Sequence, residues 1–228
     1  MIELFLSLVL AHLVADFMLQ TGKSCKDKKE RHWKSLHHYV HALIVFGFSW
    51  FVSWDVCFCW GALVIGVTHF GIDIWKSYRD DKVVWFTMDQ VLHLLVIAVV
   101  TYAWIDFHDW SLSFGVELWH IAAADALLVC WKPSNIFIKL MLKHYSVNMP
   151  AEKESGFNAG ALIGTIERWL ILVFVCMQCY DALGLLIAAK SIIRFSEKDT
   201  AKTEYVLAGT LLSIFMAMLA GMMVIGVK

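Results

Sequence analysis

The chain has 228 residues, of which 60% are hydrophobic and only 17% are charged. Soluble globular domains carry about 45–50% apolar and about 25% charged residues, so we expect lipid to surround much of this chain. The formal net charge of −1 excludes a broad basic surface of the kind that attracts nucleic acid. The six cysteines lie mostly inside apolar segments, which is typical of small buried hydrophobic residues rather than of a disulfide framework.

Long apolar segments recur along the whole chain. A helix needs about 20 mainly apolar residues to cross the hydrocarbon core of a bilayer. The segments of this kind are 2–20, 37–54, 57–76, 86–105, 115–131, 160–181 and 205–227. A shorter apolar segment, 184–195, is a half-span, a tilted helix or a continuation of its predecessor. The sequence predicts an all-α, polytopic transmembrane bundle of about seven spans, with six to eight as the range.

Basic residues are distributed unevenly between these spans. Lys and Arg are frequent in 21–35, 76–82 and 132–153, whereas 54–56 and 105–115 contain none. Because basic connections stay in the cytoplasm, the N-terminus is predicted to lie outside. We therefore expect an integral protein of the bacterial inner membrane.

The longest polar connection divides the chain. Residues 132–157 include the amphipathic stretch KPSNIFIKLMLKHY, which is expected to lie at the cytoplasmic interface. The predicted organisation is an N-terminal transmembrane bundle with a His/Asp metal site at 1–131, this interfacial connection at 132–157, and C-terminal transmembrane helices at 158–228.

Ionisable residues inside the first four spans form a repeated pattern. Each costs a few kcal/mol to insert into a membrane, so its presence needs a reason. In three of these spans a histidine and an aspartate are four residues apart, and this spacing places both on one face of a helix. The pattern comprises His12 and Asp16, the cluster His37, His38 and His41, then His69 and Asp73, and finally Asp89 and His93.

The predicted topology brings these side chains to a shared depth, with the aspartates near the cytoplasmic end of each helix and most histidines one turn deeper. Imidazole and carboxylate together suit Zn²⁺, Mn²⁺ or Fe²⁺. We predict one or two divalent ions, zinc above others, on His12, Asp16, His41, His69, Asp73, Asp89 and His93. His37 and His38, at the membrane surface, are the weakest members. The alternatives are hydrogen bonds that only hold helices together and a proton relay.

Further charged residues lie in the second half of the chain. Glu167 and Arg168 open the sixth span, and Lys190 and Arg194 share its cytoplasmic side if 184–195 returns across the membrane. A carboxylate and several cations near a metal site suit an anionic substrate, such as a phosphorylated one. Asp125, inside the fifth span, is a further ligand or a packing hydrogen-bond partner.

Several segments resemble an uncharacterised family of bacterial polytopic membrane proteins, a domain of unknown function. They are AHLVADFMLQ (11–20), HALI (41–44), THFGIDIWK (68–76), DQVLH (89–93), ERWLI (167–171) and AAKSIIRF (188–195). More loosely, the residue types and the helicity are similar to those of membrane-bound metal-dependent hydrolases. That second resemblance implies a zinc cluster held by His and Asp.

Three functions follow from this pattern. The first is a metal-dependent hydrolase at the cytoplasmic face, acting on a phosphorylated or lipid substrate, with membrane lipid as its surroundings. Asp16 or Asp89 is its predicted general base, Glu167 and Arg168 are further catalytic candidates, and Lys190 and Arg194 bind the substrate. The second is a divalent-cation or proton transporter using the same ligands, which the apolar outer halves of the spans disfavour. The third is a structural or regulatory membrane module.

Overall fold

The computed structural model describes residues 1–107, 116–145, 159–194 and 200–228, without the side chains of 159, 193, 194 and 200–203. All regular structure in these ranges is helical, which confirms the predicted all-α fold. The chain forms two compact units, Met1–Asp125 and Ala126–Lys228. The predicted boundary stood a few residues later, at 131. Each unit is described by itself.

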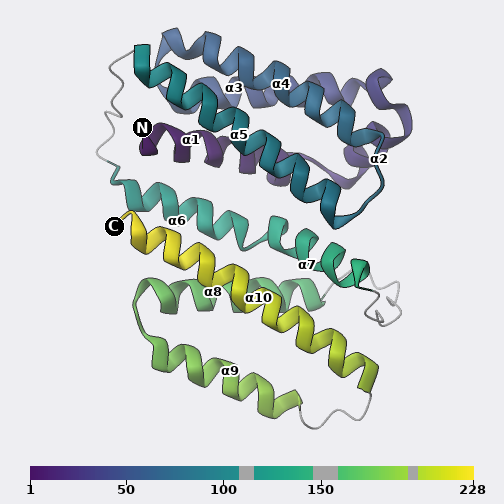
Figure 1. Cartoon of the computed structure of the whole chain (residues 1–228), viewed down its shortest axis with the longest axis vertical. Helices are drawn as coiled ribbons and strands as arrows, with labels where there is room; N and C mark the ends of the chain where they lie inside the picture. The colour runs from purple at the N-terminus through teal and green to yellow at the C-terminus, as the bar shows by residue number, and fades with distance from the viewer. Residues whose placement is uncertain (108–115, 146–158, 195–199) are drawn as a thin grey trace. The chain divides into compact units, whose positions relative to one another are not determined.

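The first unit is a bundle of four long helices with a short polar helix at one end (Figure 1). Its elements are α1 (Ile2–Leu13), the π-helical segment η1 (Val14–Leu19), α2 (Gly22–Arg31), the 3₁₀ turn η2 (His32–Lys34), α3 (Leu36–Ser53), the 3₁₀ turn η3 (Val56–Phe58), α4 (Cys59–Ser77) and α5 (Val83–Phe107). Helix α6 (Leu118–Val129) crosses the boundary between the units.

Polar residues set the starts and ends of the short elements. Helix α2 begins after Thr21, whose Oγ1 accepts a hydrogen bond from the Ser24 amide, and ends at His32 with a positive φ of 49°. Asp55 accepts a hydrogen bond from the Cys57 amide at 2.8 Å and so begins η3. These caps satisfy amides that a helix start leaves without intrahelical partners. As a result, the polar connections on both sides of α3 have defined conformations.

An apolar core fills the half of the first unit that contains the N-terminus. Its buried members come from α1, η1, α3, η3, α4 and α5, and in each long helix most of them lie farther from α2 than the histidine does. They are Leu4, Leu8, Ala15, Val45, Phe58, Ala62, Ile65 and Ile97. The hydroxyl residues Ser7, Ser49, Ser53 and Thr101 are also buried in this half, whereas the buried histidines and Asp89 of these helices lie in the other half.

The second unit contains a helix that is interrupted inside an apolar stretch. Helix α7 (Lys132–His144) follows α6 after two residues, because Pro133 has no amide hydrogen to donate to the Val129 carbonyl. The Ser134 hydroxyl donates to that carbonyl at 2.6 Å, and Arg168 Nε donates to the Cys130 carbonyl at 2.6 Å. Both freed carbonyls therefore have partners, as a helix break away from water requires.

Three further helices complete this unit: α8 (Ala159–Cys176), α9 (Tyr180–Arg194) and α10 (Thr200–Gly226) (Figure 1). Residues 184–194 of the predicted short segment 184–195 form the greater part of α9, a helix of its own that is separated from α8 by Gln178 at φ 57°. Residue 195 lies outside the described residues. Helices α8 and α10 pack closely, and a small residue, Gly221, permits it.

Five helical stretches of the described residues are long and apolar enough to cross a membrane, which indicates a membrane protein. They are Ile2–Leu19, Val56–Ser77, Val83–Phe107, Leu118–His144 and Glu204–Gly226. Helix α3 is not among them, since three histidines in its first turns lower its mean hydropathy. The fourth stretch joins residues 118–131 of the predicted fifth span to the first half, 132–144, of the predicted interfacial connection, of which 146–157 lie outside the described residues.

Replacing Gly221 by alanine is expected to destabilise the α8–α10 packing by about 1–3 kcal/mol, since a closely packed interface resists added atoms. A Cβ at this position would lie 2.6 Å from Val175 Cγ1 and 2.9 Å from Val175 Cβ. The measurement is thermal unfolding in detergent. Gly184→Ala is the matched control, because a Cβ there meets no heavy atom within 4 Å. Equal melting temperatures for both variants would contradict the close contact.

Candidate metal centre

The histidines and aspartates of the first unit converge from α1, η1, α3, α4 and α5. Asp16 lies in η1, where the chain continues α1 in a wider π-helical turn. Such turns are rare and occur frequently at functional sites. The predicted first span, 2–20, is helical from Ile2 to Leu19, and from Val14 onward the helix is of the π type. His12 Nδ1 and Asp16 Oδ1 nevertheless approach to 3.8 Å.

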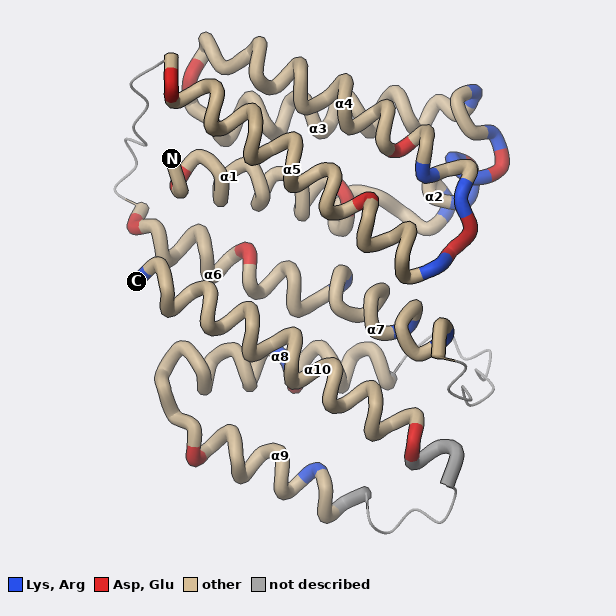
Figure 2. The backbone as a smooth tube through the Cα atoms, in the orientation of Figure 1, with Lys and Arg blue, Asp and Glu red and all other residues tan. Residues whose placement is uncertain are grey.

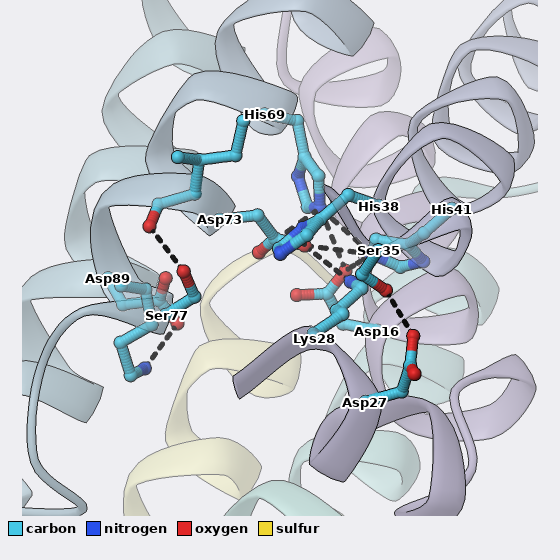
Figure 3. Close-up of polar contacts among 12 residues, drawn as sticks. Asp16, Asp27, Lys28, Ser35, His38, His41, His69, Asp73, Ser77 and Asp89 are labelled. Carbon is cyan, nitrogen blue, oxygen red and sulfur yellow. Dashed lines mark hydrogen bonds and ion pairs between the residues drawn. The ribbon is translucent and has the colours of Figure 1, made fainter. Parts of the chain in front are cut away.

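Three ligand-type atoms form a compact triangle at the middle of the cluster (Figure 3). His41 Nε2 lies 3.0 Å from His69 Nε2 and 3.1 Å from Asp16 Oδ1, and His69 Nε2 lies 3.3 Å from Asp16 Oδ1. Around a tetrahedral ion with bonds of about 2.0–2.2 Å, ligand atoms are about 3.3–3.6 Å apart. The triangle is only slightly tighter than this, so a small ion fits with a modest outward movement of the three side chains.

Two further groups lie at the edge of this triangle. Asp73 Oδ2 is 3.8 Å from His41 Nε2, and Asp73 Oδ1 is 3.9 Å from His69 Nε2. His12 Nε2 is 3.3 Å from Gln90 Oε1, an acceptor, so this nitrogen carries the proton and the Nδ1 lone pair is left for the cluster. The sets His12, Asp16, His69 and His41, His69, Asp73 could each hold a metal ion.

Asp89 and His93 of α5 extend the cluster. His93 Nε2 lies 3.5 Å from Asp89 Oδ1 and 3.9 Å from Asp73 Oδ1, and these three residues also could hold an ion. The His69 and His93 rings stack with their centroids 4.0 Å apart. All seven predicted ligands are thus linked by contacts of less than 4 Å.

The whole cluster is removed from solvent. The four histidines are 2–5% exposed, and the side chains of Asp16 and Asp73 are 10% and 14% exposed. Buried imidazole and carboxylate groups are costly unless they are paired or bind a metal. The burial and the convergence together favour a ligand cluster over isolated helix-to-helix hydrogen bonds.

Two lysines complete the charge balance of the cluster. Lys28 of α2 is 6% exposed, and its ammonium group donates to Asp73 Oδ2 at 2.6 Å (Figure 3). Lys76 of α4 donates to Asp89 Oδ2 at 2.9 Å. In the sequence, both lysines contribute only to the predicted membrane topology. The position of Lys76 three residues after Asp73 on the same helix is a local sign that it lies near the cluster, whereas no local pattern marks Lys28.

His38 also belongs to the cluster, although by sequence it ranked among the weakest candidates for the metal site. It was placed at the membrane surface, but it is 2% exposed and its Nδ1 lies 3.9 Å from Asp73 Oδ2. Helix α2 covers this side of the cluster. The Ser35 hydroxyl donates a hydrogen bond to Asp27 of α2 (Figure 3), and the His32 ring that follows α2 is hydrogen-bonded to Ser77. His37, in contrast, is exposed.

The predicted residues of the second unit have different surroundings. Arg168 is 1% exposed, and its guanidinium donates only to neutral groups among the described residues: the Cys130 carbonyl, Ser213, Asn135 and Thr165. Glu167 forms an ion pair with Lys190 between α8 and α9. The side chain of Arg194 lies outside the described residues.

Asp125, the remaining candidate, is 7% exposed, and neither carboxylate oxygen has a hydrogen-bond partner in the described part of the chain.

No curated protein and no solved structure matches the chain, so no known relative supports the looser similarity to membrane-bound hydrolases. One family model matches residues 4–121, a range that contains the seven metal ligands predicted in the first four spans. This match covers more than half of the chain and confirms the predicted resemblance to an uncharacterised family. The chain belongs to the family described as protein of unknown function DUF3307.

Proposed function

We propose that this protein is a divalent-metal-dependent hydrolase that acts at the cytoplasmic face of the membrane on a phosphorylated or lipid substrate. The observation that supports it best is the triangle of Asp16 Oδ1, His41 Nε2 and His69 Nε2, with sides of 3.0–3.3 Å. Three protein ligands with a fourth position left to water are the usual arrangement of catalytic zinc. Zinc is the first candidate because two of these three ligands are imidazoles.

A metal at the triangle would lower the pKa of its bound water and supply a nucleophile near neutral pH. Asp16, predicted as a ligand and as a general base, fits the ligand role, because its Oδ1 is one vertex of the triangle. Asp89 remains the proposed general base. His12 lies at the edge of the triangle, and its Nε2 is hydrogen-bonded to Gln90. It is therefore suited to orient the nearby ligand Asp16.

The charge of the cluster supports an anionic substrate. Among the described residues, two ammonium groups face the carboxylates of Asp16, Asp73 and Asp89, those of Lys28 and Lys76. With neutral imidazoles the cluster therefore carries one net negative charge, and a single divalent cation reverses its sign. The two lysines are then placed to stabilise the charge of a phosphate.

The apolar core favours a pocket over a transport path. Beyond the histidines, on the side away from α2, the buried positions of the bundle hold apolar residues such as Leu8, Val45, Ile65 and Ile97. The buried polar residues there, Ser7, Ser49, Ser53 and Thr101, carry hydroxyl groups but neither an imidazole nor a carboxylate. A cation leaving the cluster in that direction would lose its ligands in a low-dielectric medium, at a cost of several kcal/mol.

We also propose a topology of seven spans in the inner membrane, in which α3 and α8 join the five apolar stretches and the N-terminus lies outside. In the first unit Lys and Arg gather at α2 and at the connection between α4 and α5, at the same end (Figure 2). The positive-inside rule assigns that end to the cytoplasm. The metal centre lies beside α2 and would therefore open to the cytoplasm.

Metal-dependent release of phosphate is the test of this function. Purified protein in mixed micelles is stripped with a chelator, reloaded with Zn²⁺ or Mn²⁺, and assayed on phosphatidic acid and on p-nitrophenyl phosphate. We expect release with metal only, and a fall of at least about 100-fold in Asp16→Asn, since this change removes one of three ligands.

The matched control is Asp80→Asn, an exposed aspartate that pairs only with Lys82 among the described residues and should leave release unchanged. If metal-loaded wild type releases no more phosphate than stripped protein from either substrate, hydrolysis of this class is wrong. A cation-flux assay in proteoliposomes then tests the transporter alternative.

A further inference from the structure

Two carboxylates of the cluster are each held by a lysine through one oxygen only. Lys28 Nζ contacts Asp73 Oδ2 at 2.6 Å, and Lys76 Nζ contacts Asp89 Oδ2 at 2.9 Å. Gln90 donates to the same Asp89 oxygen at 3.1 Å. The other oxygens, Asp73 Oδ1 and Asp89 Oδ1, lie 3.9 Å and 3.5 Å from His93 Nε2. The lysines thus orient both carboxylates so that a free oxygen of each faces the same imidazole nitrogen.

The atoms that face one another here are buried without hydrogen bonds. Asp89 is 6% exposed and His93 is 3% exposed, and neither Asp89 Oδ1 nor His93 Nε2 has a hydrogen-bond partner among the described residues. Leaving such groups unsatisfied costs about 1–3 kcal/mol each, and more for a charged oxygen. A cation between them would satisfy both.

We propose that a second divalent cation binds at Asp73 Oδ1, Asp89 Oδ1 and His93 Nε2, beside the ion of the triangle. The inference rests on the metal centre proposed above. One ligand atom of each of these three residues lies within 4.8 Å of those of the other two. In both carboxylates a lysine ammonium group contacts Oδ2, the oxygen that is not a proposed ligand. Hydrogen bonds to ligating carboxylates fix their orientation in known metal sites.

Asp73 is the bridge between the two ions. Its Oδ1 is 3.9 Å from His69 Nε2 of the first site and 3.9 Å from His93 Nε2 of the second. Paired ions in hydrolytic centres lie about 3.5–4 Å apart, a spacing that one carboxylate can span. The second site has two carboxylates and one imidazole, so it is the harder of the two and favours Mn²⁺ or Mg²⁺ more than the first.

Among the substrates proposed above, a pair of ions favours phosphoric esters. Two cations stabilise the attacking and the leaving oxygen of a phosphoryl group during in-line displacement. The water oxygen forms a new bond to phosphorus, the ester P–O bond breaks, and the leaving oxygen keeps the electron pair and takes a proton. Asp89 is then a metal ligand rather than the general base.

Metal stoichiometry and electron paramagnetic resonance test the second site without any substrate. Stripped wild-type protein is titrated with Mn²⁺, and bound metal is counted by mass spectrometry. We expect two ions per chain and the broadened spectrum of a spin-coupled pair. His93→Gln is expected to bind one ion and to give the six-line spectrum of isolated Mn²⁺, whereas the control His37→Gln, an exposed histidine, keeps the coupled pair.

One ion per wild-type chain, two uncoupled ions, or a coupled pair retained in a folded His93→Gln overturns the proposal. The wild-type spectrum decides the matter even if the variant does not fold. A single ion together with phosphate release leaves the hydrolase proposal intact, whereas a coupled pair without release supports the second site and counts against hydrolysis. Absence of any bound ion removes both.

Discussion

Replacement of His69 by glutamine is expected to weaken Zn²⁺ binding by more than about 100-fold. Changes to residues that only support metal ligands already cost about 10–100-fold in affinity, and His69 is a vertex of the triangle. Its Nε2 lies 3.0 Å from His41 Nε2 and 3.3 Å from Asp16 Oδ1. Glutamine keeps the size and polarity of the side chain but is a poor zinc ligand. The measurement is competition with a chromophoric chelator in detergent.

Stability gives an independent measure of the same loss. A ligand that binds only the folded state stabilises it by about 2.7 kcal/mol at a free concentration 100 times its Kd. Zn²⁺ should therefore raise the melting temperature of wild type and of His37→Gln, but not that of His69→Gln. His37 lies on the same helix as His41 and is exposed, so it controls for loss of an imidazole. Equal Zn²⁺ affinity in His69→Gln and wild type would reject the triangle as a metal site.

Replacement of Arg168 by alanine is expected to destabilise the second unit by at least about 3 kcal/mol, among the largest effects of a single substitution. Its guanidinium makes four hydrogen bonds, to the Cys130 carbonyl, Ser213, Asn135 and Thr165. Each hydrogen bond to a charged group contributes about 1.5–3 kcal/mol. Its loss also leaves the Cys130 carbonyl, freed by the helix break, without this donor.

Chemical unfolding in mixed micelles measures this effect, with Arg31→Ala as the control for an exposed arginine. Arg168→Lys keeps the positive charge but not the planar set of donors, so we expect it to be nearly as unstable. Metal binding by the first unit should persist in any folded Arg168 variant. An Arg168→Ala protein as stable as wild type that loses only catalysis would instead support the predicted catalytic role.

The sequence by itself determined the helical class, the apolar stretches and the seven proposed metal ligands of the cluster. Hydropathy and the i,i+4 spacing of His12 with Asp16 or His69 with Asp73 are local properties, since a regular helix converts sequence distance directly into direction. The seven proposed ligands could therefore be chosen before any coordinates were known. Their shared depth followed from Lys and Arg in the connections, which is also a local signal.

Only the tertiary structure decided which atoms meet. Lys28 and Asp73 are 45 positions apart, and in the sequence a lysine in a polar connection is indistinguishable from a solvated one. Burial of its charge becomes favourable only when α2 folds over the cluster and supplies a partner. The enclosure of Arg168 has the same origin, because its guanidinium donates to the Cys130 carbonyl and to Ser213, which are 38 and 45 positions away. Periodicity within a helix carries no record of such contacts.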